Sequence, residues 1–281
     1  VFKEAEIAPT EIHVPQEMRL TREEFVDNFK FYVQSLEEVF PFRHKLLLEP
    51  IKDVIKEELS DYGFSVEDLL DLVPTGIEAL DDSEGGLVKK TSTLLLAGDT
   101  RDKERFLLSF SRQGAVDKDG VIYLSSRQPS EVILNAILRD VDALDGVTLM
   151  DLYRAVFIDP VKEVIVEGNR IILPVNLTLI RYEMVKAIKG QLREVHKRVV
   201  VDILNDLLRY YGFRQISSVV FKWLEGFRKW NCTSVFALDP NLLGEGELAE
   251  LEKKFDNVIE LVDTEAGIRV KRMYGSTPHD I

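Results

Sequence analysis

The chain has 281 residues, a hydrophobic fraction of 45% and a formal net charge of -13 at pH 7. This length allows one large domain, or one domain with a small appendage, and the apolar fraction is sufficient for a core. Affinity for a nucleic-acid backbone comes mainly from clustered Lys and Arg. The negative charge therefore argues against a protein whose main task is to coat nucleic acid.

The cysteine and histidine content argues against metal sites and disulfides. The single cysteine, Cys232, excludes an internal disulfide framework and a CxxC metal site. It begins an apolar run, so we expect a buried structural thiol. The histidines show no HxxxH or HxH spacing, so no metal site is expected; they are His13, His44, His196 and His279.

The location of the protein is predicted from what the sequence lacks. No apolar run approaches the roughly 20 residues that a membrane span needs, and no signal peptide is recognisable. We therefore expect a cytoplasmic protein. High Lys and Glu with few Asn and Gln is a pattern of thermophilic proteins.

Residues 1–72 are predicted to form an N-terminal arm and a small helical extension. The first 17 residues contain Pro9 and Pro15 and show no periodicity, which indicates an extended arm. From Leu20 to Leu72, capping boxes and apolar residues at helical spacing predict three helices. This extension could cover the core of the main domain or dock a partner, and the sequence leaves both open.

Residues 73–281 alternate between strand and helix patterns, which predicts parallel strands joined by crossover helices. The expected helices span residues 102–116, 130–140, 177–195 and 215–230, and the apolar stripe of the last of them is expected to be core. The last two expected strands, joined through Ala266-Gly267, predict an antiparallel hairpin at one edge; Gly168-Asn169 predicts another hairpin. The expected strands span residues 93–97, 121–125, 155–158, 198–204, 233–238, 258–262 and 268–273.

The segment 91–105, TSTLLLAGDTRDKER, reads as a buried strand, a turn at Gly98 and a helix from about Asp102. In nucleotide-binding proteins, a loop of the form GxxxxGK[ST] at this position holds phosphates through backbone N–H groups and a lysine. The eight residues that stand there in this chain are Gly98, Asp99, Thr100, Arg101, Asp102, Lys103, Glu104 and Arg105.

The chemistry of that loop is altered. Gly98 fits the first glycine, but Lys103 stands in the position of the second glycine, Glu104 in that of the lysine and Arg105 in that of the Mg²⁺-binding hydroxyl. A side chain on the loop and a carboxylate facing phosphate would both oppose binding. Acidic and basic residues alternate along it, so we expect a solvent-exposed helix start with mixed charge rather than a new anion site.

A second candidate is Asp202, in the segment RVVVDILNDLL. In phosphate-loop NTPases, an acid at the end of a strand holds Mg²⁺, usually through water. A plain cap or turn residue is the alternative. Because Asp202 comes two predicted strands after the glycine turn, it is interpreted as a positional relic of a metal-binding strand.

Several segments together resemble the KaiC-type branch of the RecA-like ATPases, which is widespread in archaea. The lead-in VPTGIEALDDSEGGL, the strand LLLAG, and the segments GVIYLSSRQPSEVI and RVVVDILNDLL carry the resemblance, together with the C-terminal stretch from Leu238 to Ser276. It runs from about Val73 to the end of the chain. It implies an α/β fold with a mostly parallel RecA-like sheet flanked by helices.

The chain departs from the family pattern at further catalytic positions. The adjacent glutamates that follow the second strand, one of which activates water in the family, appear here as Arg127 and Gln128. The polar sensor appears as Ala237-Leu238, and the C-terminal Lys-Met-Arg-Gly run appears as Arg272-Met273-Tyr274-Gly275. Phosphoryl transfer needs positioning and charge neutralisation from all of these parts, so we expect no hydrolysis.

The resulting expectation is a non-catalytic, KaiC-like pseudo-ATPase that acts as a regulatory or assembly subunit and needs no cofactor. It would pair with itself or with a KaiC-like paralogue, and the N-terminal extension would bind a protein partner. One alternative is a weak sensor of ATP or ADP with Mg²⁺, in which Lys103 and Asp202 are the discriminating residues. Another is an accessory recombination factor that contacts DNA, which follows from fold analogy alone.

Overall fold

The computed structural model describes residues 72–98, 100–139, 146–191, 195–262, 268–272 and 279–280. The chain divides into two units, Val1–Leu69 and Leu70–Ile281, and the described residues belong to the second. The predicted N-terminal arm and helical extension lie outside the described residues. None of the helices that the structure describes has the length and apolar character to cross a membrane.

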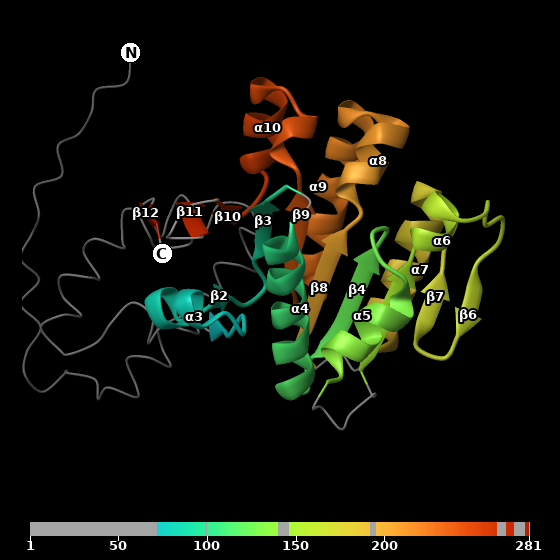
Figure 1. Cartoon of the computed structure of the whole chain (residues 1–281), viewed down its shortest axis with the longest axis horizontal. Helices are drawn as coiled ribbons and strands as arrows, with labels where there is room; N and C mark the ends of the chain where they lie inside the picture. Colours follow the sequence, from blue (N-terminus) through green and yellow to red (C-terminus); the bar gives the residue numbers. More distant parts are fainter. Residues whose placement is uncertain are drawn as a thin grey trace, which may run out of the picture. The chain divides into compact units, whose positions relative to one another are not determined.

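A 10-stranded sheet forms the centre of the second unit, with strand order β12-β11-β10-β3-β9-β8-β4-β5-β7-β6 (Figure 1). Neighbours from β10 to β7 are parallel, whereas β11 and β12 at one edge and β6 at the other are antiparallel. The strands are β3 (Ser92–Leu96), β4 (Gly120–Ser125), β5 (Val147–Asp151), β6 (Ile165–Glu167), β7 (Arg170–Ile172), β8 (Lys197–Asp202), β9 (Cys232–Leu238), β10 (Asn257–Leu261), β11 (Ile268–Arg272) and β12 (His279–Asp280).

This topology confirms the mostly parallel sheet, the C-terminal hairpin and the hairpin at Gly168. A small two-stranded sheet pairs β1 (Leu72–Val73) with β2 (Leu87–Val88) in the lead-in segment. The helices are α3 (Glu78–Glu84), α4 (Arg101–Val116), α5 (Ser130–Ile137), α6 (Tyr153–Phe157), α7 (Leu177–Gly190), α8 (Leu204–Tyr211), α9 (Phe213–Lys229) and α10 (Glu245–Glu252), with a short 3-10 turn η3 (Pro240–Leu242).

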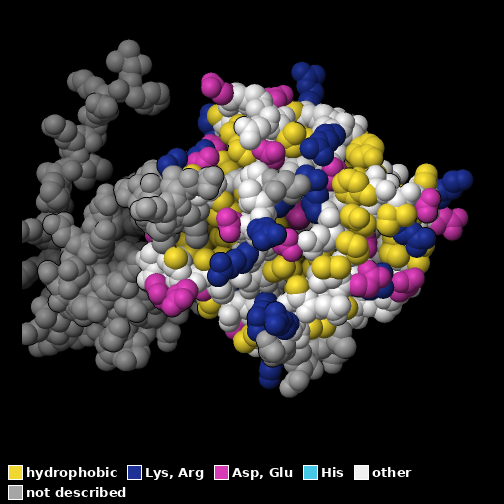
Figure 2. Space-filling view, in the orientation of Figure 1, with side chains coloured by type: hydrophobic (Ala, Val, Ile, Leu, Met, Phe, Trp, Pro, Cys, Tyr) yellow, Lys and Arg dark blue, Asp and Glu magenta, His cyan; other side chains and the backbone are white. Residues whose placement is uncertain are grey.

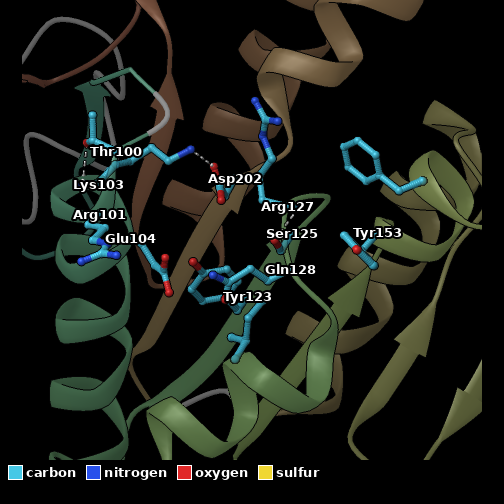
Figure 3. A pocket seen from close by; sticks show the side chains of 12 residues that line it. Thr100, Arg101, Lys103, Glu104, Tyr123, Ser125, Arg127, Gln128, Tyr153 and Asp202 are labelled. Carbon is cyan, nitrogen blue, oxygen red and sulfur yellow. Dashed lines mark hydrogen bonds and ion pairs between the residues drawn. The ribbon is translucent and has the colours of Figure 1, made fainter.

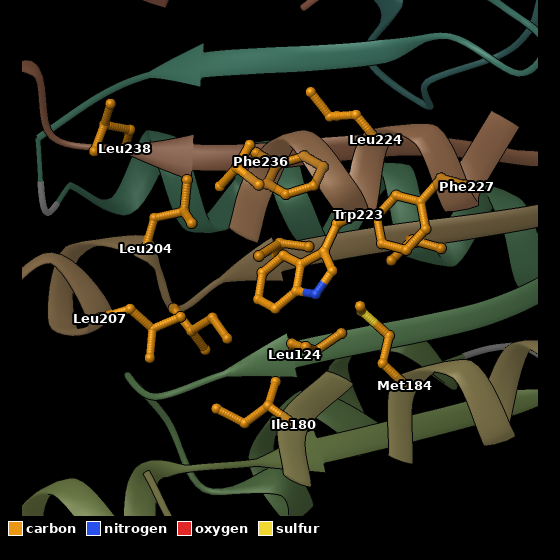
Figure 4. Close-up of a cluster of buried hydrophobic side chains, with 14 of the residues drawn as sticks. Leu124, Ile180, Met184, Leu204, Leu207, Trp223, Leu224, Phe227, Phe236 and Leu238 are labelled. Carbon is orange, nitrogen blue, oxygen red and sulfur yellow. The ribbon is translucent and has the colours of Figure 1, made fainter. Parts of the chain in front are cut away.

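Both faces of the sheet are buried. Successive residues of a strand point to opposite faces, so neighbouring residues that pack into two different clusters show that both faces are covered. On β3, for example, Leu94 packs into one hydrophobic cluster and Leu95 into the other. One cluster collects residues of α7, α8, α9 and α10 (Figure 4); the other collects residues of α3, α4 and α5. Near-continuous apolar strands are what a sheet covered on both faces requires.

The stripe predicted to be core on the helix 215–230 is confirmed. Ile216, Val220, Trp223 and Phe227 of α9 are all buried, and Figure 4 shows Trp223 and Phe227 beside Phe236 of β9. The rings of Phe227 and Phe236 lie 5.9 Å apart between centroids. Burial of such side chains stabilises the fold by roughly 1.5–3 kcal/mol each.

Two predicted elements are wrong. Residues 155–158 were expected to form a strand, but α6 occupies this region and the neighbouring strand β5 was missed. A short apolar run does not distinguish a strand from a helix by periodicity, and Phe157 and Ile158 are in fact exposed. The strand expected over 198–204 ends at Asp202, where the chain turns into α8.

A buried arginine fixes α4 against the sheet at the end of β8 opposite Asp202. Arg198 is 1% exposed and donates from Nε to Asp119 Oδ2 over 2.7 Å. It also bonds the carbonyl of Pro74 and the carboxylate of Asp117. A Cβ added at Gly114 of α4 would lie 2.5 Å from Arg198 Cδ, so glycine is required where the helix passes this side chain.

Asp119 also contacts a histidine in this cluster. His196 Nδ1 lies 3.1 Å from Asp119 Oδ2, and His196 Nε2 lies 2.8 Å from Thr233 Oγ1. Burial raises the pKa of Asp119, but the hydrogen bonds and electrostatic attraction of His196 and Arg198 lower it by more, so the net pKa is below the ordinary value. The carboxylate thus stays charged in the fold.

Candidate functional site

The site begins where the central strand β3 turns into α4. Thr100 is the N-cap of α4, and its Oγ1 accepts a hydrogen bond from the backbone N of Lys103 over 3.3 Å. Threonine is a preferred N-cap because its hydroxyl satisfies one of the free amides of the first turn. One of the amides that would face a phosphate is therefore already bonded to the chain itself.

Lys103 and Asp202 form a buried ion pair at the carboxyl ends of β3 and β8. Lys103 Nζ lies 3.1 Å from Asp202 Oδ1, and the two side chains are 3% and 9% exposed (Figure 3). Asp202 is the last residue of β8, as the sequence predicts. The expectation of a solvent-exposed helix start is wrong for Lys103. This third residue of α4 faces the sheet, and its ammonium group contacts Asp202.

The other loop residues are more accessible to solvent. Thr100, Arg101, Asp102 and Arg105 are exposed, and Glu104 is half-buried. For this part of the loop the expected mixed-charge helix start is confirmed. Gly98 is half-buried, and Asp99 lies outside the described residues.

A cavity of about 400 Å³ opens beside this pair. Parallel α/β sheets bind ligands at the carboxyl ends of their strands, and this cavity lies there, between the first turn of α4 and the ends of β4 and β8 (Figure 3). Its lining is Thr100, Arg101, Lys103, Glu104, Tyr123, Ser125, Arg127, Gln128, Ile133, Tyr153, Phe157 and Asp202.

The end of β4 contributes hydroxyls and a cation to the site. Ser125 Oγ accepts from the backbone N of Arg127 over 3.1 Å. Ser126 Oγ donates to Asp206 Oδ2 over 2.6 Å, and Arg127 Nε lies 4.0 Å from the same carboxylate oxygen. Arg127 and Gln128, which stand where the sequence comparison places the family's glutamates, both line the cavity.

Tyr123 forms part of the cavity wall from the middle of β4. It is 3% exposed, and burial raises its pKa well above the ordinary value, with the charges of Asp202 and Glu104 adding to the effect. The phenol is therefore neutral and available as a hydrogen-bond donor. Figure 3 shows its ring beside the Glu104 side chain.

The side of the cavity away from α4 is aromatic. Tyr153 and Phe157, one turn apart on α6, have ring centroids 5.3 Å from each other. Phe157 is 53% exposed. Exposed apolar side chains continue from here through Ile158 to Ile165 and Val166 of the edge strand β6, and Figure 2 shows hydrophobic side chains gathered on this part of the face.

The sequence analysis singled out the loop, Asp202, Arg127 and Gln128, and it missed the remaining lining residues. Tyr123 and Ser125 carry a signal, since a tyrosine and a serine interrupt an otherwise apolar strand. Tyr153 and Phe157 could be recognised as a pair only after α6 was assigned as a helix. Asp206 lies in α8, which the sequence analysis did not predict.

Two of the remaining altered positions of the family pattern are apolar residues of the core. Ala237 and Leu238 are buried at the end of β9. Arg272 ends β11, and the residues after it up to 278 lie outside the described part. In the described ranges, no group of three or more His, Cys, Asp or Glu side chains is placed to hold a metal ion.

Comparison with known proteins supports the family. A family profile described as the KaiC ATPase matches residues 73–274, which include every residue of the site. The chain belongs to the KaiC family. No curated protein matches it.

A solved structure gives the same architecture. The KaiC-like protein PH0186 from the hyperthermophilic archaeon Pyrococcus horikoshii OT3 shares 18% sequence identity, and the match covers 75% of this chain and 93% of that chain with a TM-score of 0.50. At this identity the likeness shows the fold alone. The KaiC resemblance and the RecA-like fold are thus confirmed.

Proposed function

We propose that this chain is a KaiC-family protein that does not hydrolyse ATP and that acts as a regulatory or assembly subunit through protein contacts. The buried pair of Lys103 and Asp202 carries the proposal. In phosphate-loop NTPases, the lysine binds phosphate and the strand-end acid serves Mg²⁺. Here each side chain neutralises the other.

Water activation supports the same conclusion. A general base must lie within hydrogen-bond reach of the attacking water, or one water away. The carboxylates among the described lining residues are Glu104, on the first turn of the loop's own helix, and Asp202, which is paired. The end of β4, where the family places glutamates, presents Ser125, Arg127 and Gln128.

Charge also opposes a nucleotide at the loop. Glu104 lies in the first turn of α4, directly after the lysine. A carboxylate there interacts favourably with the positive end of the helix dipole. A phosphate bound at the same place would compete with it for this interaction. The carboxylate would also repel a polyphosphate.

An assembly role predicts self-association, or binding to a KaiC-like paralogue, without nucleotide. The experiment is sedimentation analysis of the full chain, alone and mixed with a paralogue, with and without millimolar Mg-ATP. The proposal predicts complexes of the same mass with and without nucleotide. Complexes that form only with ATP, or a monomer under every condition, would contradict it. The protein partner of the N-terminal extension stays a prediction.

A weak nucleotide sensor is the second candidate, and one observation favours it. Although Lys103 stands one position early in the loop, its ammonium group reaches the end of β8 beside a cavity of about 400 Å³. Nucleotide at 100 times its Kd would stabilise the fold by about 2.7 kcal/mol. Thermal melting with Mg-ATP and Mg-ADP tests this, and a shift that Lys103→Met abolishes would establish the sensor.

A further inference from the structure

The helices α7 and α9 are basic in an acidic chain. Together they contain seven basic and two acidic residues, whereas the whole chain has a net charge of -13. Of the two acids, Glu183 is buried and pairs with Lys186 over 3.4 Å. The half-buried Glu225 is the other. Because salt screens charges beyond about 8–10 Å, a ligand at these helices responds to their local charge rather than to that of the whole chain.

α7 and α9 lie side by side on one face of the sheet and run in the same direction. Both are crossover helices between parallel strands. Their inner faces share one hydrophobic cluster, which contains Met184 of α7 and Trp223 of α9 (Figure 4). Their ends also meet, because Lys189 Nζ lies 5.8 Å from the centroid of the Trp230 ring, just beyond the end of α9. The outer faces of the two helices therefore form one continuous surface.

Two lysines of α9 point to this surface on the side nearer α7. Ser217 marks the opposite side of α9, because its hydroxyl bonds Glu250 of α10 over 3.1 Å. Successive residues of an α-helix turn by about 100°, which places Lys222 and Lys229 well away from Ser217, and both lysines are exposed. The acidic helix α10 and these two cations thus lie on different sides of α9.

α7 contributes two further cations. Lys189 is exposed and reaches towards α9. Arg181, which is also exposed, precedes it by a little over two helical turns and so lies on roughly the same side of α7. In the described ranges, no carboxylate forms an ion pair with Arg181, Lys189, Lys222 or Lys229. We call the surface with these four cations the α7–α9 surface.

An aromatic ring stands beside the cations. Tyr182 of α7 is 62% exposed, more than any other large apolar side chain in the described ranges, and it directly follows Arg181. Proteins that bind single-stranded nucleic acid combine cations that track the backbone with aromatic side chains on which bases stack. Both kinds of group are present on the α7–α9 surface.

We propose that the α7–α9 surface binds a single-stranded nucleic acid. The phosphates lie along the four cations, and a base stacks on Tyr182. A single strand fits better than a duplex, whose base faces are already stacked on one another, and better than an acidic peptide, whose carboxylates offer the ring no planar partner. The carboxylates of α10 keep the strand on the side of α9 nearer α7. This binding goes beyond the proposed role in assembly and does not depend on it.

Fluorescence anisotropy of a labelled oligothymidylate of about 20 nucleotides, titrated with the full chain, measures the binding. Each phosphate that is neutralised on a single strand contributes about -0.7 to the slope of log K against log salt concentration. Four contacts predict a slope of about -2.8, which is a loss of roughly 50-fold in affinity between 50 and 200 mM salt. A duplex of the same length should bind at least about fivefold more weakly.

Variants locate the contact. Lys222→Gln with Lys229→Gln removes two of the four cations and should halve the slope to about -1.4. The matched control, Lys118→Gln with Lys253→Gln, changes two exposed lysines outside these helices, gives the same net charge and should leave the slope unchanged. Tyr182→Ala should weaken binding by about fivefold or more, whereas Tyr182→Phe retains the ring and should bind as the wild type does.

Absence of saturable binding at 50 mM salt would overturn the proposal, and so would equal slopes for the two double variants or unchanged binding by Tyr182→Ala. Duplex binding as tight as that of the single strand would also contradict it. Tighter binding of a poly-glutamate peptide, or of vesicles that contain anionic lipid, would assign the surface to an acidic protein or a membrane instead. Hydrolysis and assembly without nucleotide are measured separately, so failure here is distinguishable from failure of the proposed function.

Discussion

Breaking the Lys103–Asp202 pair on one side should destabilise the fold strongly. Both side chains are at least nine-tenths buried, and Nζ and Oδ1 are 3.1 Å apart. Removing one partner of a buried ion pair costs about 3–5 kcal/mol. We therefore expect this loss in free energy of unfolding for Lys103→Met, and a similar loss for Asp202→Asn.

The double variant separates a buried pair from two independent residues. The variant Lys103→Met with Asp202→Asn removes both charges of the pair, so its cost should be well below the sum of the single costs. For a unit of this size, 1 kcal/mol corresponds to roughly 2–4 °C in Tm, so each single variant should melt on the order of 10 °C lower. Denaturant unfolding of the wild type, the two single variants and the double variant completes a double-mutant cycle. Additive costs, or single costs below about 1 kcal/mol, would refute the reasoning.

Three further predictions concern the scaffold. Gly114→Ala should destabilise the fold by about 1–3 kcal/mol, since the added Cβ would lie 2.5 Å from Arg198. Gly190→Ala is the control and should cost nothing, because its Cβ meets nothing within 4 Å. Equal melting temperatures of the two variants would contradict this prediction. The lowered pKa of Asp119 contributes stability that is present above the ordinary Asp pKa of about 3.9 and is lost as pH falls through the lower folded value. Asp119→Asn should therefore make the free energy of unfolding less dependent on pH in the acid range. An unchanged pH dependence would argue against this role of Asp119. Burial raises the pKa of Cys232 to about 12, so iodoacetamide at pH 8 should modify the thiol only after unfolding, and rapid labelling of native protein would show the burial to be wrong.

The sequence predicted the parts of the fold that depend on local pattern. The strands β3, β4, β8 and β9 could be recognised as apolar runs bounded by turns. They are apolar almost throughout because both faces of the sheet are covered. The segments around Asp151 and Phe157 were assigned wrongly, because two short apolar runs lie close together and only packing against β4 and β7 decides which becomes the strand.

The site was predictable in its positions but not in its contacts. Counting from Gly98 places Lys103 in a glycine position, and this count does not show which face of α4 the side chain occupies. Because the helix starts at Arg101, its third residue turns towards β8 and meets Asp202. The relation between Glu104 and Tyr123 likewise depends on how α4 packs over β4, which no spacing in the sequence encodes.

Phosphate release from Mg-ATP by the purified full chain tests the central claim most directly, with Asp202→Asn as the control for contaminating ATPases. The account predicts that wild type and Asp202→Asn release phosphate at the same rate, equal to the background without protein. Mg²⁺-dependent release by the wild-type chain that Asp202→Asn abolishes, at a temperature where both chains are shown to be folded, would show that the site is catalytic and would contradict the account.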